Sequence, residues 1–180
     1  MRVLLHICCA PCTIFPLTAL RGEGHEVGGF FYNPNIHPYS EYEKRLDTLR
    51  GYAAETALDV IISEGYPIEL FFRDVSFREE ERCGPCYRLR LEQTAARAGE
   101  RGFDAFSTTL LYSKYQKHDL IREAAEEVSL KTGVLFLYRD FRQGWQQGVD
   151  VSREMNMYRQ KYCGCIYSER ERFLKKRKAR

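Results

Sequence analysis

Residues 3–13 read VLLHICCAPCT, and this stretch decides the fold. The apolar run at its start predicts a first strand that ends near Cys8. Pro11 follows within a few residues, and proline is favoured in the first turn of a helix. The stretch therefore predicts a strand, a short turn that carries three cysteines, and a helix that ends near residues 21–24.

The same alternation continues along the chain. Apolar runs predict strands, and apolar residues spaced by three or four predict helices. The predicted strands are Glu26–Tyr32, Val60–Ile62, Phe103–Thr108 and Val134–Tyr138, and helices are expected from a capping box at Ser40 and Glu43, from Pro85, from Leu120 to a stop at Gly133, and over most of residues 140–163. This order predicts a parallel α/β sheet with helices on both faces, in which functional residues gather outside the carboxyl ends of the strands.

The composition excludes several classes of protein. The chain has 180 residues, of which 44% are hydrophobic and 29% charged, and these fractions are ordinary for one globular domain. We therefore expect a single domain over residues 1–180. The sequence has no run of about 18 apolar residues, and its start does not resemble a secretion signal. We expect a cytoplasmic protein that does not associate with membranes.

Charge is unevenly distributed. The formal net charge is +3, but residues 169–180 alone carry seven Lys or Arg and two Glu, a net charge of +5. The remaining residues therefore sum to −2. A basic tail on a nearly neutral body is suited to contact nucleic acid, although a solvated terminal helix explains the same charges.

The seven cysteines fall into three groups: CCAPC (Cys8, Cys9, Cys12), CGPC (Cys83, Cys86) and CGC (Cys163, Cys165). Core packing is a poor explanation for so many paired thiols. Four of them suit a structural zinc site, but this leaves the three at the end of the first strand unexplained. CGPC is also the thioredoxin tetrapeptide, although here it follows charged residues and not a strand. The remaining hypothesis is a multi-metal or iron–sulfur site, since thiolates select soft metals.

Six segments together resemble the cobalamin-independent epoxyqueuosine reductases of the QueH type. The segments are HICCAPC (6–12), FYNPNIHP (31–38), RCGPCYRLRL (82–91), STTLLYSKYQKHDLI (107–121), YRDFRQGW (138–145) and YRQKYCGCIYS (158–168). They cover nearly the whole chain, and Lys114 is the one departure, at a turn where the family often has proline. The resemblance implies an α/β fold related to PP-loop and HUP-type nucleotide-binding folds, with CCAPC in place of the phosphate loop. The chain has no phosphate-loop motif, so ATP use is not expected.

The resemblance also implies a [4Fe–4S] cluster, a nearby mononuclear iron, and a tRNA substrate with epoxyqueuosine at the wobble position of the anticodon loop. Reduction of an epoxide to an alkene consumes two electrons and two protons. Protein side chains do not readily supply the electrons, so a metal centre or a redox cofactor is expected, together with an external electron donor. Our division of the ligands gives Cys9, Cys83, Cys86 and Cys163 to the cluster, and Cys8, Cys12 and Cys165 to the iron.

Two other residues are candidate proton donors. His37 follows a predicted strand in a loop, and Asp140 follows another, although Asp140 is equally suited to cap the next helix. His6 is expected to pack in the core, and His118 to lie near a helix start. Several tyrosines are candidates for stacking on an extruded base, and several cations for contacts with phosphates. These are Tyr32, Tyr39, Tyr112, Tyr115, Tyr138, Tyr158 and Tyr162, and Arg139, Arg142, Arg153, Arg159 and Lys161.

Overall fold

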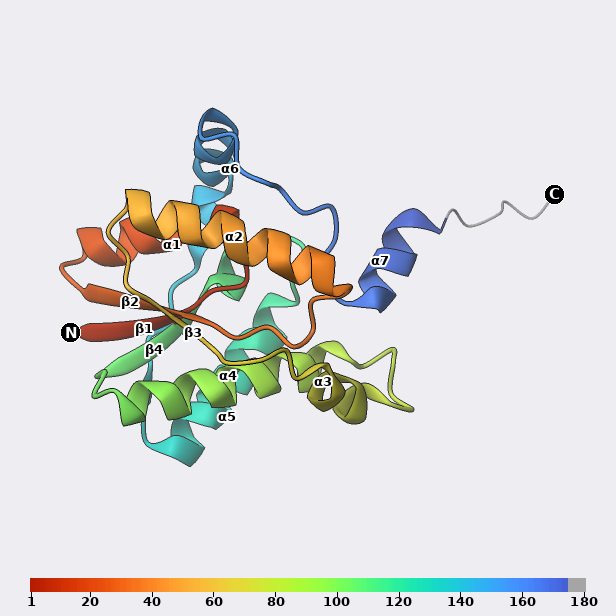
Figure 1. Cartoon of the computed structure of the whole chain (residues 1–180). Coiled ribbons are helices and arrows are strands. Elements are labelled where there is room, and N and C mark those ends of the chain that lie inside the picture. Colours follow the sequence, from red (N-terminus) through yellow and green to blue (C-terminus); the bar gives the residue numbers. More distant parts are fainter. Residues whose placement is uncertain (175–180) are drawn as a thin grey trace.

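A sheet of five parallel strands forms the centre of the computed structural model, which describes residues 1–174 (Figure 1). The strand order is β3-β2-β1-β4-β5, the order of a doubly wound sheet. The strands are β1 (Arg2–His6), β2 (Glu26–Phe31), β3 (Val60–Ile62), β4 (Ala105–Thr108) and β5 (Leu135–Phe136). The predicted α/β class is therefore confirmed.

The central strand β1 is buried on both faces. Val3, Leu4 and Leu5 have no exposed surface, which explains why this strand reads as an unbroken apolar run and not as an alternating one. Its neighbours are in parallel register, with His6 opposite Phe30 of β2 and Thr108 of β4. The carboxyl ends of the central strands therefore lie together at one edge of the sheet.

Helices cover both faces of the sheet, as predicted. In Figure 1, α1 and α2 lie on one side, and α4 and α5 on the other. The helices are α1 (Ala10–Gly22), α2 (Tyr39–Glu55), α3 (Ile68–Val75), α4 (Cys83–Glu100), α5 (His118–Thr132), α6 (Trp145–Glu154) and α7 (Ile166–Phe173), with 3-10 turns η1 (Thr109–Tyr112) and η2 (Phe141–Gly144). Gly133 ends α5 with a φ of 74°, which confirms the predicted stop.

The structure differs from the sequence-based expectations in four places. α2 begins at Tyr39 after Pro38 and has no side-chain cap, so the predicted capping box at Ser40 is wrong. The last strand spans only two residues at the edge of the sheet. Helix α3 was not predicted. α6 ends at Glu154, and residues 155–165 then run without a helix to α7.

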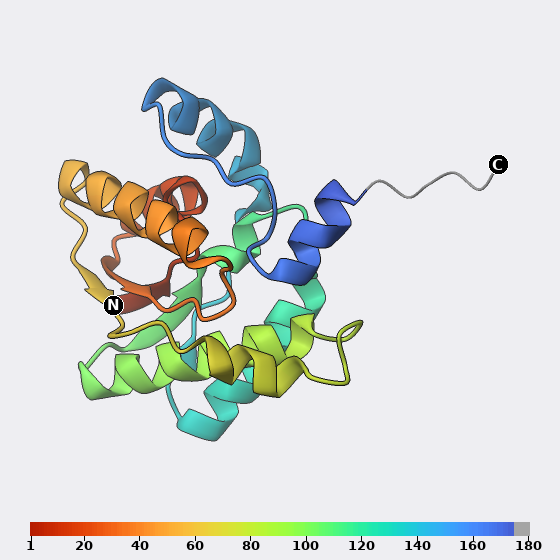
Figure 2. The ribbon, with the colours of Figure 1, turned by 45° about the vertical axis from the view of Figure 1, so that its right-hand side comes forward.

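The C-terminal segment crosses the carboxyl edge of the sheet to reach α7 (Figures 1 and 2). An ion pair of 2.7 Å between Arg82 and Glu171 fixes α7 beside the start of α4. The predicted basic tail begins inside α7, whereas its residues 175–180 lie outside the described part of the chain. Within residues 1–174, every helix is too short or too polar to cross a bilayer.

Candidate metal centre

Cys8, Cys9 and Cys12 meet where β1 ends and α1 begins. All three sulfur atoms lie within 4.8 Å of one another, and the Sγ atoms of Cys8 and Cys9 are 3.9 Å apart. Cys9 is the N-cap of α1, and its Sγ accepts a hydrogen bond of 3.3 Å from the backbone N–H of Cys12. The helix N-terminus thus presents its positive end to the sulfur atoms.

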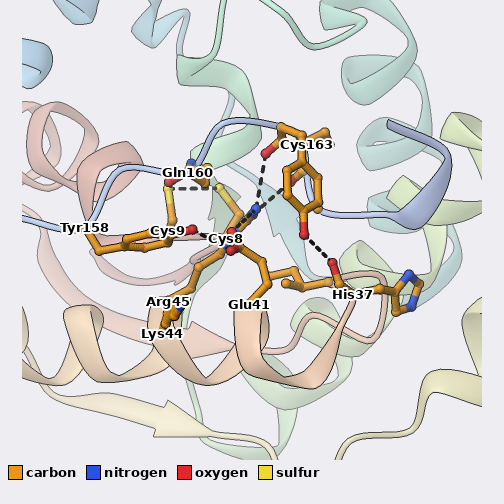
Figure 3. Close-up of polar contacts among 12 residues, drawn as sticks. Cys8, Cys9, His37, Glu41, Lys44, Arg45, Tyr158, Gln160 and Cys163 are labelled. Atoms are coloured by element: carbon orange, nitrogen blue, oxygen red, sulfur yellow. Dashed lines mark hydrogen bonds and ion pairs between the residues drawn. The ribbon is translucent and has the colours of Figure 1, made fainter. Parts of the chain in front are cut away.

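Two polar side chains from distant parts of the sequence hold these three sulfur atoms. The Thr109 hydroxyl, at the end of β4, donates to Sγ of Cys8 at 3.3 Å and accepts from the Cys8 backbone N–H at 3.1 Å. Gln160, in the C-terminal segment, donates from Nε2 to Sγ of Cys9 at 2.9 Å and of Cys12 at 3.6 Å (Figure 3). Hydrogen-bond donors therefore face the sulfur atoms from two sides.

These contacts shift the pKa values of the three thiols in different directions. Hydrogen bonds from Cys12, Cys9 and Thr109 lower the pKa of Cys8 well below its ordinary value. Burial raises the pKa of Cys9, and hydrogen bonding to Cys8 raises the pKa of Cys12. Of the three thiols, Cys8 therefore has the surroundings that most favour the thiolate, which is the form that binds metals.

The other four cysteines lie around the start of α4. Cys83 and Cys86 occupy its first turn, and the buried Cys86 and Cys165 pack together with Phe71 and Val75. Cys165 caps α7, and its Sγ accepts from the backbone N–H of Ser168 at 3.4 Å. These thiols come from segments about 80 residues apart in the sequence.

A cavity of about 620 Å³ joins the two groups of cysteines. Cys8 and Cys12 line it from one group and the exposed Cys163 from the other, where Nε2 of Gln116 donates to Sγ of Cys163 at 3.1 Å. The wall also contains Tyr112, Tyr115, Trp145, Arg90, Arg159 and Lys161. The structure therefore brings sulfur atoms from the first and third groups to one solvent-accessible space.

A buried ion pair on α2 holds the C-terminal segment over this cavity. Arg45 and Glu41 are 2.7 Å apart and almost fully buried, and Arg45 donates to the backbone carbonyls of Cys163 at 2.8 Å and Tyr162 at 3.1 Å (Figure 3). The Tyr158 hydroxyl donates to the second oxygen of Glu41. We call Glu41, Arg45 and Tyr158 the α2 clamp.

His37 also forms hydrogen bonds with the C-terminal segment. Its backbone N–H donates to the Gly164 carbonyl at 2.8 Å, and its backbone carbonyl accepts from the Tyr162 hydroxyl (Figure 3). Both ring nitrogens are engaged, Nε2 with the Pro34 carbonyl at 3.1 Å and Nδ1 with the backbone N–H of Ile166 at 3.3 Å. Burial lowers the pKa of His37. The side chain does not line the cavity, so its position gives no support to the expected proton donor.

Asp140 caps η2, the alternative that the sequence left open. Its carboxylate accepts from the backbone N–H of Arg142 and pairs with the Arg142 guanidinium, and this hydrogen bonding lowers the pKa of Asp140 to about 2. Asp140 does not line the cavity, so neither its place nor its charge supports a role as proton donor.

His6 is fully buried, as expected, with Nδ1 2.9 Å from the Thr108 hydroxyl. His118 begins α5 and hydrogen bonds to the Tyr138 hydroxyl at 3.0 Å.

The aromatic and basic candidates separate into two sets. Tyr112 stacks on Trp145 with ring centroids 5.2 Å apart, and the exposed Tyr115 contacts Trp145 edge-on at the cavity. Arg159 and Lys161 line the same cavity. The remaining basic candidates are engaged elsewhere in ion pairs, which join Arg139 to Glu23, Arg142 to Asp140 and Arg153 to Asp150.

Several residues of this site were not singled out from the sequence. Gln160 and Arg90 lie inside the conspicuous segments YRQKYCGC and RCGPCYRLRL, so proximity to cysteine was an available signal. The spacing of four residues between Glu41 and Arg45 was another, because such pairs attract one another on a helix. A surface ion pair has the same spacing, however, and only the fold shows that this pair is buried.

The donor set fits a thiophilic metal. With metal–sulfur bonds of about 2.3 Å, two thiolates on one tetrahedral ion lie about 3.8 Å apart, and the Cys8–Cys9 separation is 3.9 Å. All described ligands of the first group are sulfur, which favours iron, zinc or copper(I) over harder ions. The residues present therefore fit a metal held by thiolates.

A doubly wound sheet with clustered cysteines at its carboxyl edge defines an α/β protein with a thiolate site suited to metal and redox chemistry. A family model described as epoxyqueuosine reductase QueH matches residues 3–171. The chain belongs to this epoxyqueuosine reductase family, as its motifs indicated, and it is therefore an oxidoreductase.

The similarity to individual relatives agrees with this family assignment. The chain is 40% identical to epoxyqueuosine reductase QueH of Dehalococcoides mccartyi over 97% of this chain and 96% of the relative. It is 38% identical to the protein of the same name from Thermotoga maritima, over 94% and 91%. Both alignments span nearly the whole of each chain, so the site and its scaffold are compared together.

Among solved structures, the fold resembles a predicted subunit of a tRNA methyltransferase from Methanocaldococcus jannaschii. The TM-score is 0.59 over 86% of this chain and 75% of that chain, at 10% sequence identity. This likeness concerns the fold alone. Together with the strand order, it agrees with the expected relation to PP-loop and HUP-type folds.

Proposed function

We propose that this enzyme removes the epoxide oxygen of epoxyqueuosine in the anticodon loop of tRNA, which yields queuosine at the wobble position. The observation that carries the proposal is the cavity shared by Cys8, Cys12 and Cys163, in a chain of the epoxyqueuosine reductase family. A [4Fe–4S] cluster and a mononuclear iron, when bound by the seven cysteines, would relay the two electrons of an external donor for cleavage of the carbon–oxygen bond.

The geometry favours a division of the ligands by group. Cys8, Cys9 and Cys12 form one compact set, so we propose that they hold the single iron. Cys83, Cys86, Cys163 and Cys165 would then hold the cluster. The division expected from the sequence instead assigns Cys9 to the cluster and Cys165 to the iron, and it stays open as the alternative.

The Cys9→Ser variant distinguishes between the two ways of dividing the cysteine ligands. If Cys9 belongs to the single iron, anaerobically reconstituted Cys9→Ser protein keeps about four sulfides per chain and loses iron alone. If Cys9 belongs to the cluster, sulfide falls together with iron. Cys165→Ser is the matched variant, and the two divisions predict the opposite result for it.

The cavity wall is suited to a nucleobase. Trp145 and Tyr112 offer stacked aromatic surface, and aromatic side chains commonly bind unstacked bases of single-stranded RNA. Arg159 and Lys161 place positive charge at the same cavity for flanking phosphates. Arg172, in the described part of the basic tail, lines the same cavity, whereas residues 175–180 lie outside the described part of the chain.

We propose that the proton donors are other than His37 and Asp140, because neither side chain lines the cavity. Among the described residues, the wall of the cavity contains no Asp, Glu or His side chain. The polar groups that do line it are hydroxyl, amide, cationic and thiol groups. We therefore propose that water admitted to the cavity delivers the protons, while the protein holds the substrate and the sulfur ligands.

The decisive experiment combines metal analysis with turnover. Protein purified without oxygen should contain iron and acid-labile sulfide, show an iron–sulfur signal in electron paramagnetic resonance, and convert epoxyqueuosine-containing tRNA to queuosine-containing tRNA with a chemical reductant. Colourless zinc protein that iron cannot reconstitute would favour a zinc-stabilised RNA-binding module. Metal-free reduction of a disulfide, lost in Cys83→Ser, would favour a thioredoxin-like oxidoreductase.

Further parts of the proposal concern the setting of the reaction. We propose that residues 1–180 act as one catalytic domain, that electrons come from an external donor, and that ATP is not consumed. We also propose that the enzyme works in the cytoplasm without a membrane, where its tRNA substrate is found. Titration of turnover against added ATP and reductants in a purified system tests the electron donor and the independence from ATP, and fractionation of cells tests the location.

A further inference from the structure

Arg90 is a buried cation that lacks a carboxylate partner. Its residue is 1% exposed, and it lies on the face of α4 turned toward the sheet and the cavity. No ion pair within residues 1–174 includes Arg90, and the six remaining residues contain no Asp or Glu. A guanidinium keeps its charge in proteins, so this charge is buried without an acidic side chain against it.

The α2 clamp provides the comparison. Arg45 is equally buried, but the Glu41 carboxylate lies 2.7 Å from it, and the pair is close to neutral. An unpaired charge in the interior is costly unless an opposite charge compensates it. Arg90 therefore needs a negative partner other than a carboxylate.

The negative partner available to Arg90 is cysteine sulfur. Its Nη2 atom donates to Sγ of Cys86 at 3.2 Å, and its Nε atom donates to the Cys86 backbone carbonyl at 3.0 Å. Arg90 also lines the cavity together with Cys8 and Cys163. The guanidinium thus lies between the two groups of cysteines and contacts one sulfur atom directly.

We propose that Arg90 is the counter-charge of the metal–thiolate centre and that it raises the reduction potential of this centre. The inference rests on the proposed iron chemistry, and it assigns Arg90 a positioning role through electrostatics and not a contact with substrate. Metal binding converts thiols to thiolates, which supplies the missing negative charge. A nearby cation stabilises the reduced, more negative state, and a hydrogen bond to a ligand sulfur acts in the same direction.

The test is a redox titration of the reconstituted protein, followed by electron paramagnetic resonance. Arg90→Gln removes the charge but keeps a donor amide, and it should lower the midpoint potential. Arg90→Lys keeps the charge, and its potential should stay close to that of the wild type. Arg88→Gln is the control on the same helix, because Arg88 is exposed and paired with Glu127 at 2.9 Å. The midpoint potential of Arg88→Gln should equal that of the wild type.

Each result decides the inference. A lower potential in Arg90→Gln only, or failure of Arg90→Gln to retain iron while Arg90→Lys retains it, supports the counter-charge. An unchanged potential in Arg90→Gln with full iron and sulfide overturns it, and so does equal loss of iron in both variants. Wild-type protein that never binds iron contradicts the proposed function instead, and the two failures are therefore distinct.

Discussion

The Asp140 carboxylate accepts a hydrogen bond of 3.0 Å from the backbone N–H of Arg142 and forms an ion pair of 2.6 Å with its guanidinium. Asp140→Asn keeps the capping oxygen but cannot exchange a proton. Because the cap is the role that the structure shows for Asp140, turnover and its pH profile should match those of the wild type. Asp140→Ala loses the cap, and we expect it to lower the free energy of unfolding by about 1 kcal/mol. Steady-state turnover and urea unfolding of both variants provide the measurements.

A contrary result would be informative. If Asp140→Asn loses turnover while Asp140→Ala and the wild type unfold alike, then the carboxyl acts in the reaction and not as a cap. The candidate becomes credible only if substrate binding moves the segment that follows β5 toward the cavity.

At the scale of single residues, the sequence makes the candidate metal ligands conspicuous, but not the residues that support them. Cysteines in CxxC and CxC spacing are conspicuous because few other roles explain them. Thr109, Gln160 and Arg90 are ordinary polar residues, and they reach the sulfur atoms only after folding, in the case of Gln160 and Cys9 across 151 positions of sequence. Contacts of that span leave no local pattern.

Among the elements, α2 acts on the site through its clamp. Arg45→Met leaves the buried Glu41 without its cation and the carbonyls of Tyr162 and Cys163 without their donor. We expect a loss of about 3–5 kcal/mol in the free energy of unfolding, the range for a broken buried pair. Tryptic cleavage after Arg159 and Lys161 should accelerate, because the segment that carries them loses its attachment. Urea unfolding and timed proteolysis measure the two effects.

The same helix offers a control. Arg50 pairs with Asp47 at 3.0 Å on the exposed face, so Arg50→Met should change stability by no more than about 0.5 kcal/mol. Adding Glu41→Gln to Arg45→Met should recover part of the loss, since no uncompensated charge remains. Equal effects of Arg45→Met and Arg50→Met would show that the clamp does not hold the segment.

The junction of η2 and α6 depends on a glycine. A Cβ atom at Gly144 would lie 1.9 Å from the Phe15 ring of α1, whereas one at Gly51, inside the exposed face of α2, would meet nothing within 4 Å. Gly144→Ala should therefore destabilise the protein by about 1–3 kcal/mol through overpacking. Gly51→Ala should stabilise it by about 0.5–1 kcal/mol through helix propensity. Thermal unfolding of the two variants should shift in opposite directions, and a shared direction would contradict the packing argument.

The elements that sequence predicted well are those with strong periodicity. β1 carries an unbroken apolar run and α5 a continuous apolar stripe, and both patterns follow directly from burial. β5 was predicted too long because VLFLY is apolar throughout, yet the strand lies at the sheet edge and Leu135 is half exposed. The run 155–165 resembles a polar helix, but its contacts with α2 and the cysteines override local preference.

On the scale of the whole molecule, parallel topology explains why the cysteines converge. The turn after β1 lies at this edge of the sheet, α4 begins there with Cys83 and Cys86 before it runs back to β4, and the C-terminal segment with Cys163 and Cys165 crosses the same edge. A metal bound there would link the beginning, middle and end of the chain. Composition and strand order predicted this edge, whereas the path of the last twenty described residues had to come from the fold.

Acid should unfold the protein through its buried histidines. Burial lowers the pKa of His6 to about 4, and it also lowers those of His37 and His118. In the unfolded chain a histidine titrates near 6.5, so below that pH the unfolded state binds more protons and stability falls as the pH is lowered. For His6 alone, the loss between pH 6.5 and pH 4 is about 3 kcal/mol. Urea unfolding of metal-free protein across this range measures the slope without loss of metal. His6→Gln should flatten it, and a slope identical to that of the wild type would show that His6 is not the group that titrates.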